Sequence, residues 1–500
     1  MNYIFLKARS VIIPALFFMV VSALPAYSEL TPHMTDPLGQ SSTELPLDSA
    51  ALQRKALAEE LDTYAPQMSD PGEDAWWKQF NDPTLDWLIQ RASQYNLSLA
   101  SAIRSIEATR YSLKAIQSGY YPSLSASAMY QSGQTSGAMA KGNSTKPIGE
   151  NYMGLSLDLS WEIDIFGRIR KQTEEATASY NASRAEYVAT LTSLCAQVAS
   201  VYFDLAAARE LYATALSHLE SEQKILDITN VRLETGLSSK LDACQALTVV
   251  LDTKASIPSI KSRIEGDINM LALLTNSSPE EIKGRLNNPQ LPICDTLMVS
   301  AIEPELMRRR PDVAEAEYNL AAACAKAGLA KKDWLPTLSL SASIATESHS
   351  AKDLFTGNSL SYSVAPTLAW TIFDGFERKY SIAEAKQGVL AAADTYDYTI
   401  ASARQEVATA TSDFLCLLEE IELLKQAAEQ SYESLNLSLE LYKSGLDPFT
   451  DVANSQVSWL SYENSVINAK YNALSTLITL YKALGGGWNG ELPSFNNSKK

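Results

Sequence analysis

A helical pattern of unusual length occurs twice in this chain. The segment between Gly167 and Gly236 contains no other Gly and no Pro. Its apolar residues recur at alternating spacings of three and four, the stripe of a helix that packs along its length. The stripe consists of Leu191, Leu194, Val198, Val201, Leu205, Ala208, Tyr212, Ala215 and Leu219. At 1.5 Å per residue this segment predicts a helix of ~100 Å, far longer than a globular core.

The same pattern returns later in the chain. A shift of 209 residues superposes three landmark pairs: Trp161 on Trp370, Gly236 on Gly445 and Asp242 on Asp451. The shifted stripe is apolar at every position: Ile400, Ala403, Val407, Ala410, Phe414, Leu417, Ile421, Leu424 and Ala428. Upstream the shift is 214, which places 121–125 on 335–339 and gives the first copy a longer loop. The sequence therefore predicts a tandem repeat. An ordinary coiled coil is the alternative explanation of the stripes alone.

Each long helix is expected to turn back on itself. Gly236 and Gly445 suit the left-handed position that closes a helix. Return helices should start near Ser238 and Pro448 and run to about residues 274 and 484. Pro258 is expected to interrupt and kink the first of them. Two antiparallel helical hairpins per chain result, each with a free tip.

Four shorter segments alternate with period two, so that one face is apolar and the other small or polar. In one of them, for example, Leu155 and Leu157 alternate with Ser156 and Asp158. The predicted strands cover about 121–131, 152–163, 335–345 and 361–373. Their length and aromatic ends favour transmembrane strands, and a soluble half-buried sheet is the alternative. Because four strands cannot close a barrel and lipid does not tolerate an open edge, three copies should share twelve strands.

The first 28 residues predict a secretory signal peptide. Lys7 and Arg9 precede an apolar run over 11–24, and Ala26-Tyr27-Ser28 offers the small residues that signal peptidase accepts. An uncleaved membrane anchor is the alternative, although the run is short for a bilayer span. Cleavage would take the formal charge from −17 to −19.

Composition argues against several functions. The acidic charge would repel nucleic acid and attract cations into any enclosed lumen, although solubility explains the charge equally well. The sequence contains no P-loop, nucleophile elbow or dinucleotide fingerprint, and its three histidines share no ligand spacing. The five cysteines at 195, 244, 294, 324 and 416 form no CxxC motif, and we expect buried thiols. No enzymatic activity, cofactor or metal is expected.

Short motifs between about Ala75 and Gly487 carry a family resemblance. Trp76, Trp77, Phe80 and Asp82 form a WWxxFxDPxL opening. Arg309, Arg310, Pro311 and Asp312 belong to an RRPDV run. Trp161–Arg168 and Trp370–Gly375 leave the second strand of each pair. Together they resemble the TolC-like outer-membrane efflux family, in the branch of exit ducts that serve resistance-nodulation-division pumps.

The resemblance implies an α+β membrane protein of two tandem repeats, each with two transmembrane β-strands and a long α-helical hairpin. It also implies a homotrimer with a twelve-stranded β-barrel in outer-membrane lipid and a periplasmic helical tunnel. We expect a signal peptide at 1–28, an extended segment at 29–74 and a flexible tail at 488–500. The first repeat should cover 75–295, with its helical hairpin at about 168–275. The second repeat should cover 296–487, with its helical hairpin at about 376–485.

The resemblance also assigns roles to the helix tips. Tyr442 and Gly445 match the family's second tip, and Asp451 matches an acid that faces the pore. The resemblance thus places Tyr442, Asp451 and Asn454 at the periplasmic aperture. A second family acid is replaced by Asn454, so a single ring of three Asp451 carboxylates is expected, and capping of a helix is the alternative role. Gly236 and Gly445 shape the tips that meet the adaptor. Relatives often carry a lipidated cysteine, but no Cys precedes residue 195 here, so no lipid anchor is expected.

The expected function is a passive outer-membrane exit duct of a tripartite efflux system, with a periplasmic adaptor and an inner-membrane transporter as partners. A duct for type I protein secretion would share the fold, although the WWxxF and RRPD motifs argue against it. A soluble periplasmic coiled-coil scaffold is the alternative from a different functional class.

Overall fold

The computed structural model describes residues 75–135, 148–286, 291–292, 310–486 and 492. These residues all belong to one compact unit, Ala58–Lys500. The expected signal peptide, the extended segment and all of the tail but residue 492 lie outside the described residues, as do Arg309, Cys294 and most of the loop between the first two strands.

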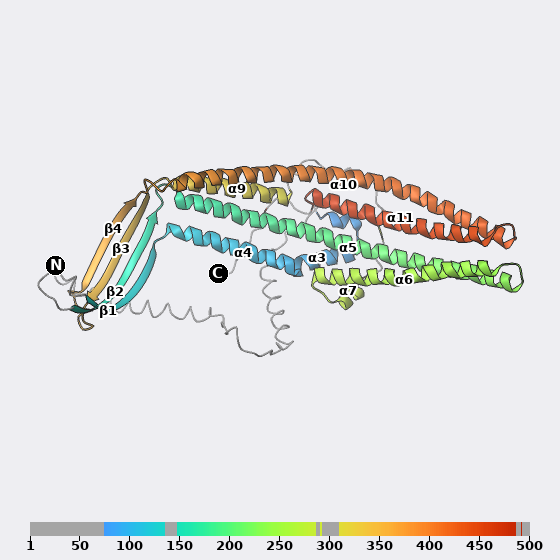
Figure 1. Cartoon of the computed structure of the whole chain (residues 1–500), viewed down its shortest axis with the longest axis horizontal. Coiled ribbons are helices and arrows are strands. Elements are labelled where there is room, and N and C mark those ends of the chain that lie inside the picture. The colour runs from blue at the N-terminus through green and yellow to red at the C-terminus, as the bar shows by residue number, and fades with distance from the viewer. Residues whose placement is uncertain (1–74, 136–147, 287–290, 293–309, 487–491, 493–500) are drawn as a thin grey trace. The chain divides into compact units, whose positions relative to one another are not determined.

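Helices and strands alternate in two similar series (Figure 1). The first series is η3 (Trp76–Phe80), α3 (Pro83–Tyr95), α4 (Leu97–Gln117), η4 (Ser118–Tyr120), β1 (Ser123–Thr135), β2 (Ile148–Ile163), α5 (Arg168–Glu234), α6 (Lys240–Thr275) and α7 (Pro279–Arg285). The second is α9 (Pro311–Lys332), β3 (Thr337–Ser348), β4 (Leu360–Ala369), α10 (Glu377–Lys443) and α11 (Phe449–Ala483). In both series a helix leads into a strand pair, and the strand pair leads into a helical hairpin.

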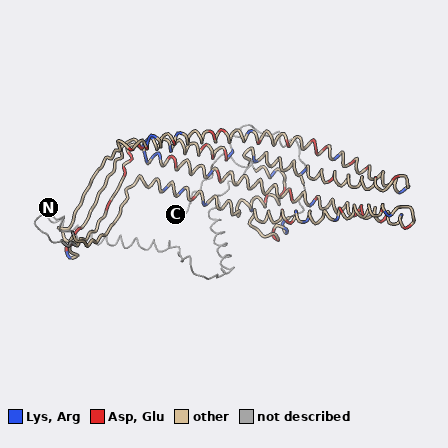
Figure 2. Tube along the Cα trace, in the orientation of Figure 1, with Lys and Arg blue, Asp and Glu red and all other residues tan. Residues whose placement is uncertain are grey.

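The four strands form one antiparallel sheet in the order β1-β2-β3-β4. Its register places Asp158 of β2 between Ser125 of β1 and Ser343 of β3, so the small polar residues share one face. The other face carries apolar side chains that stay exposed, including Leu124, Tyr362 and Leu368. Every residue of β4 is exposed, and charged residues are scarce along the strands (Figure 2). Within the described chain, this sheet leaves apolar surface and both edges without a cover.

The two long helices, α5 and α10, are each 67 residues long, which corresponds to ~100 Å. No residue of either apolar stripe is exposed, so the predicted packing face is confirmed. α5 packs against α6, α9, α4 and α11, and α10 packs against α11 and α9. α5 is also the one helix of the described residues that is long and apolar enough to cross a membrane, but 61% of that apolar window is buried inside the protein. Burial in the protein core therefore accounts for its apolar character.

Both long helices end in a Schellman turn. Gly236 and Gly445 have φ of +74° and +75°. The Gly236 N–H donates to Leu233 O at 3.0 Å, and the Leu237 N–H donates to Arg232 O at 2.7 Å. The second tip repeats this pattern. The turns thus satisfy carbonyls that the helix itself leaves free.

Two sequence expectations need correction. α6 is assigned as one helix from Lys240 to Thr275 with Pro258 inside it, so the predicted interruption is wrong. Cys195 is buried, but Cys244, Cys324 and Cys416 are exposed in the chain. These three residues lie on helix faces that other elements of the same chain do not cover. The apolar stripe predicts burial only for its own face of the helix and says nothing about the other faces.

A pair of acidic side chains between α5 and α6 leads to a pH prediction. Burial raises the pKa of Asp267 to about 7; the Asp204 carboxylate adds to this rise, and Arg263 opposes it. Between about pH 4 and 7 the native state therefore holds a proton that the unfolded chain has released. The contribution of Asp267 to stability falls as the pH rises through this window.

We expect Asp267→Asn to raise the thermal midpoint of the solubilised protein at pH 8 and to leave it unchanged at pH 4. The amide cannot ionise, so it avoids a charge that is costly in this position. Asp227→Asn, at an exposed carboxylate of α5, is the control. An equal change at both pH values would show that the raised pKa does not matter.

Candidate functional site

The tips of the two hairpins contact each other through Tyr442, near the end of α10. Its side chain is buried, and its ring meets Phe449 edge to face at 5.3 Å between centroids. The Arg232 guanidinium lies over the ring at 4.8 Å, and the Tyr442 hydroxyl is hydrogen-bonded to Ser238 Oγ at 2.9 Å. Arg232 Nη1 also donates to Lys443 O at 2.7 Å. Tyr442 therefore joins the first tip to the second within one chain.

The sequence reasoning missed Arg232 and Ser238. The repeat contained a usable signal, because the 209-residue shift places Arg232 on Leu441 and Leu233 on Tyr442. Positions at which the two copies differ between apolar and polar residues are candidates for contacts between the copies.

Asp242 and Asp451 occupy matching first-turn positions but have different surroundings. The Asp242 carboxylate accepts hydrogen bonds from Ser238 Oγ at 2.7 Å and from Ser239 Oγ at 2.8 Å, within a capping box at the start of α6. Burial alone would raise the pKa of Asp242, but these hydroxyls, the Ser239 N–H and the Arg232 charge together lower that pKa.

Asp451 has no such partners. The N-cap of α11 is Pro448, which has neither a hydroxyl nor an N–H to offer, and no side-chain capping bond forms there. Asp451 is exposed, and so is Asn454 one turn later. No hydrogen bond or ion pair from the Asp451 carboxylate is found among the described residues. A capping box therefore does not explain Asp451, although its place in the first turn remains favourable to the helix dipole.

The residues of the WWxxF motif anchor the start of the described chain. Trp76 stacks on Tyr481 of α11 with 5.3 Å between ring centroids, and Phe80 meets Phe203 of α5 at 5.0 Å. Trp76 and Trp77 are both buried. The motif therefore holds η3 against two helices that are distant from it in sequence.

Asp82 continues this anchor. Its Oδ1 accepts from the Thr84 N–H at 2.8 Å and caps α3, and its Oδ2 accepts from the Tyr202 hydroxyl at 2.5 Å. One carboxylate thus starts a helix and ties it to α5.

The RRPD motif joins three helices. Pro311 is the first residue of α9, and Arg310 directly before it is buried. Arg310 donates to the Asp312 carboxylate, to Glu406 Oε2 of α10 at 2.9 Å and to Ala483 O of α11 at 2.8 Å. Burial would raise the pKa of Asp312, but the Arg310 guanidinium overcomes this and lowers it. Asp312 therefore forms an ion pair, and its Oδ1 also accepts a hydrogen bond from the Val313 N–H in the first turn of α9 at 3.0 Å.

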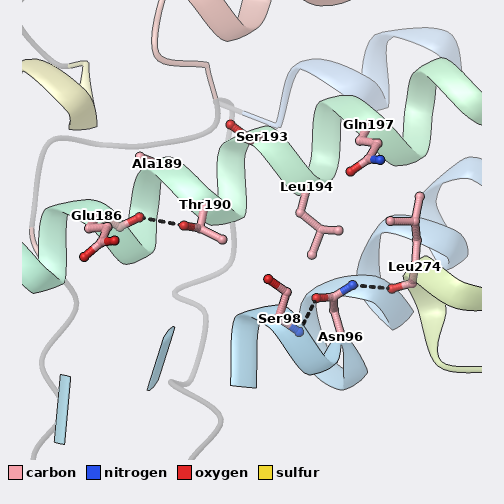
Figure 3. A pocket seen from close by; sticks show the side chains of 9 residues that line it. All are labelled: Asn96, Ser98, Glu186, Ala189, Thr190, Ser193, Leu194, Gln197 and Leu274. Atoms are coloured by element: carbon pink, nitrogen blue, oxygen red, sulfur yellow. Dashed lines mark hydrogen bonds between the residues drawn. The ribbon is translucent and has the colours of Figure 1, made fainter. Parts of the chain in front are cut away.

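A groove of about 360 Å³ lies between the α3–α4 junction and α5 (Figure 3). It is lined by Asn96, Ser98, Glu186, Ala189, Thr190, Ser193, Leu194, Gln197 and Leu274. Asn96 Oδ1 accepts from the Ser98 N–H, and Asn96 Nδ2 donates to Leu274 O, both at 2.9 Å. The Asn96 amide thus forms its hydrogen bonds with backbone groups and connects the start of α4 to the end of α6. No group of His, Cys, Asp and Glu suited to a metal occurs in the part of the chain that the structure describes.

Comparisons with known proteins agree with this architecture. Residues 88–277 and 304–486 match the family model of outer membrane efflux proteins. The outer membrane protein OprJ of Pseudomonas aeruginosa is 30% identical over 414 residues, which cover 83% of this chain and 86% of OprJ. The probable efflux pump outer membrane protein TtgC of Pseudomonas putida is 27% identical over 432 residues, 85% of this chain and 88% of TtgC.

The solved structure of the outer-membrane channel OprN superposes with a TM-score of 0.78 at 28% identity. The match covers 85% of this chain and 96% of OprN. The fold, with its exposed sheet and long helical hairpins, is thus that of outer-membrane channels. This chain belongs to the outer membrane efflux protein family and is the outer-membrane exit component of an efflux system.

Proposed function

We propose that three copies of this chain form a passive duct across the outer membrane and the periplasm. The observation that carries this proposal is the sheet, which has apolar exposed residues on one face, serines on the other and two open edges. Backbone groups at an open edge are costly in lipid. Three sheets joined edge to edge would close a barrel of twelve strands, with the serine face toward the lumen.

The proposed partners are those that the family resemblance implies. Three pairs of helical hairpins would extend the lumen into the periplasm as a helical tunnel. A periplasmic adaptor would contact the tips at Gly236 and Gly445, and an inner-membrane transporter of the resistance-nodulation-division type would supply the energy. The names of similar proteins include antibiotic and toluene efflux pumps, which supports drugs or other small toxic compounds as cargo.

The periplasmic mouth is proposed to carry a ring of three Asp451 carboxylates, with Asn454 beside it and Tyr442 holding the tips. Asp451 is exposed and has no capping partner, which supports this role. Three like charges around a narrow axis would concentrate cations at the entrance.

The experiment that tests the duct is membrane fractionation followed by sizing. We expect the protein in detergent-solubilised outer membrane as a trimer of chains that begin near Glu29. A monomer in the soluble periplasmic fraction would favour the coiled-coil scaffold instead. Deletion of the gene separates the two ducts: drug sensitivity supports efflux, and loss of a secreted protein supports type I secretion.

A further inference from the structure

The polar face of the sheet carries one carboxylate away from the strand ends. Asp158 lies inside β2, whereas the other acidic residues of the four strands, Glu150, Glu162 and Glu347, each lie within two residues of a strand end. The described strands β1 to β4 contain no Lys or Arg (Figure 2). The middle of the sheet therefore holds a single charged residue, and that charge is negative.

Hydroxyl groups from two strands hold the Asp158 carboxylate. Ser156 Oγ of β2 donates to Oδ2 at 2.5 Å, and Ser343 Oγ of β3 donates to Oδ1 at 2.6 Å. Ser127 of β1 is in turn hydrogen-bonded to Ser156, with 2.7 Å between the two hydroxyl oxygens. The network spans three strands and keeps the carboxylate on the same face as the serines.

These hydroxyl partners are neutral, so they orient the Asp158 carboxylate without cancelling its charge. Glu162, near the end of β2, differs in this respect, because Arg168 pairs with it at 2.7 Å. No ion pair to Asp158 is found in the part of the chain that the structure describes. Since an unpaired carboxylate is costly away from water, Asp158 favours water on the serine face.

We propose that Asp158 selects for positive charge inside the barrel, at a level separate from the periplasmic mouth. The proposal rests on the proposed duct, in which three copies bring three Asp158 carboxylates to one level of the lumen. Rings of acidic side chains favour cations in channels, and residues that face the lumen tune selectivity in membrane barrels. Cationic compounds would be concentrated at this level, and anionic compounds would be depleted.

The size of the lumen determines how far this charge acts. Twelve tilted strands ~4.8 Å apart enclose a lumen with a radius on the order of 10 Å. The Debye length is ~30 Å at 0.01 M salt and ~3 Å at 1 M salt. The three charges therefore act across the whole lumen at low salt, whereas at high salt each charge acts only close to the wall.

A thiol on a nearby strand can report this charge directly. Ser363 of β4 is exposed and lies opposite Ser343 in the register of β3 and β4. It is therefore on the serine face, two strand spacings or ~10 Å from Asp158. The purified, detergent-solubilised Ser363→Cys variant is labelled with a cationic and with an anionic methanethiosulfonate. Both rates are measured on the peptide that contains residue 363, which excludes the native cysteines. The ratio of the two rates removes any change in the reactivity of the thiol itself.

We expect Asp158→Asn, added to Ser363→Cys, to lower the ratio of cationic to anionic labelling roughly fivefold at 0.01 M salt. At 1 M salt the ratio should be the same with and without the substitution. Asp158→Glu keeps the charge and should keep the ratio. Asp451→Asn is the matched control, because it removes a carboxylate from the first turn of α11, at the hairpin tip (Figure 1), and should leave the ratio unchanged.

An unchanged ratio in Asp158→Asn at low salt would overturn the selective role of Asp158 and leave the duct proposal standing. So would an equal loss at 0.01 M and 1 M salt, because that result would reflect altered packing of the sheet and not its field. A thiol that reacts with neither reagent would instead contradict an aqueous lumen, and with it both proposals.

Discussion

Asp451→Asn is expected to weaken block of the channel by trivalent cations from the periplasmic side by about tenfold or more. If three Asp451 carboxylates surround the narrow mouth, their charge raises the local cation concentration by one to three orders of magnitude. Trivalent cations would also find oxygen ligands there. Asparagine removes the charge at nearly constant volume. Planar bilayers with the purified trimer give both the block and the cation preference, and trimer assembly should persist.

Asp242→Asn is the matched control. It makes the same change at the equivalent position of the first hairpin, where the carboxylate belongs to a capping box. We expect a stability loss of ~0.3–1 kcal/mol from the lost first-turn carboxylate and normal block. Asn454→Asp should tighten block, because Asn454 is exposed one turn from Asp451. Unchanged block in Asp451→Asn would remove the ring and leave only the helix-dipole role.

The sequence predicts the long helices well because their information is local and repeated. The stripe from Leu191 to Leu219 follows one helix face, and its second copy from Ile400 to Ala428 repeats the same constraint. The strand faces are equally local, since each side chain alternates with its neighbour. Pro258 shows the limit of such reasoning, because α6 continues as one helix with this proline inside it.

Contacts between the hairpins could not be predicted in the same way. Tyr442 meets Ser238 across 204 residues, and His218 meets Glu463 across 245. Both contacts depend on how far one helix is shifted along another, which no local pattern specifies. The residues of the WWxxF and RRPD motifs were identified from the sequence as a family signature. Their contacts between helices became visible only in the structure. The hydrogen bond from the Tyr202 hydroxyl to Asp82 is the clearest case.

Gly236→Val and Gly445→Val are each expected to abolish drug resistance while the trimer still assembles in the outer membrane. Both glycines have positive φ, and a β-branched residue there costs ~1–3 kcal/mol. The turn would relax to another conformation. At the first tip this moves Ser238 away from Tyr442, and at the second it moves the Lys443 carbonyl away from Arg232.

The loss of resistance should come from the tips and not from the fold, because both turns lie at the ends of the long helices, and the sheet has its own register of backbone bonds. Gly266→Val is the matched control. Gly266 lies inside α6 in open space, without positive φ, and valine is no worse in a helix interior than glycine. We expect wild-type resistance from this control, and export should fall to the level of a strain without the gene in the two tip variants. The amount of trimer in the membrane should be measured in the same strains. If the trimer is missing in the tip variants, the turns are needed for folding. If both tip variants keep wild-type resistance, the adaptor does not need this turn geometry.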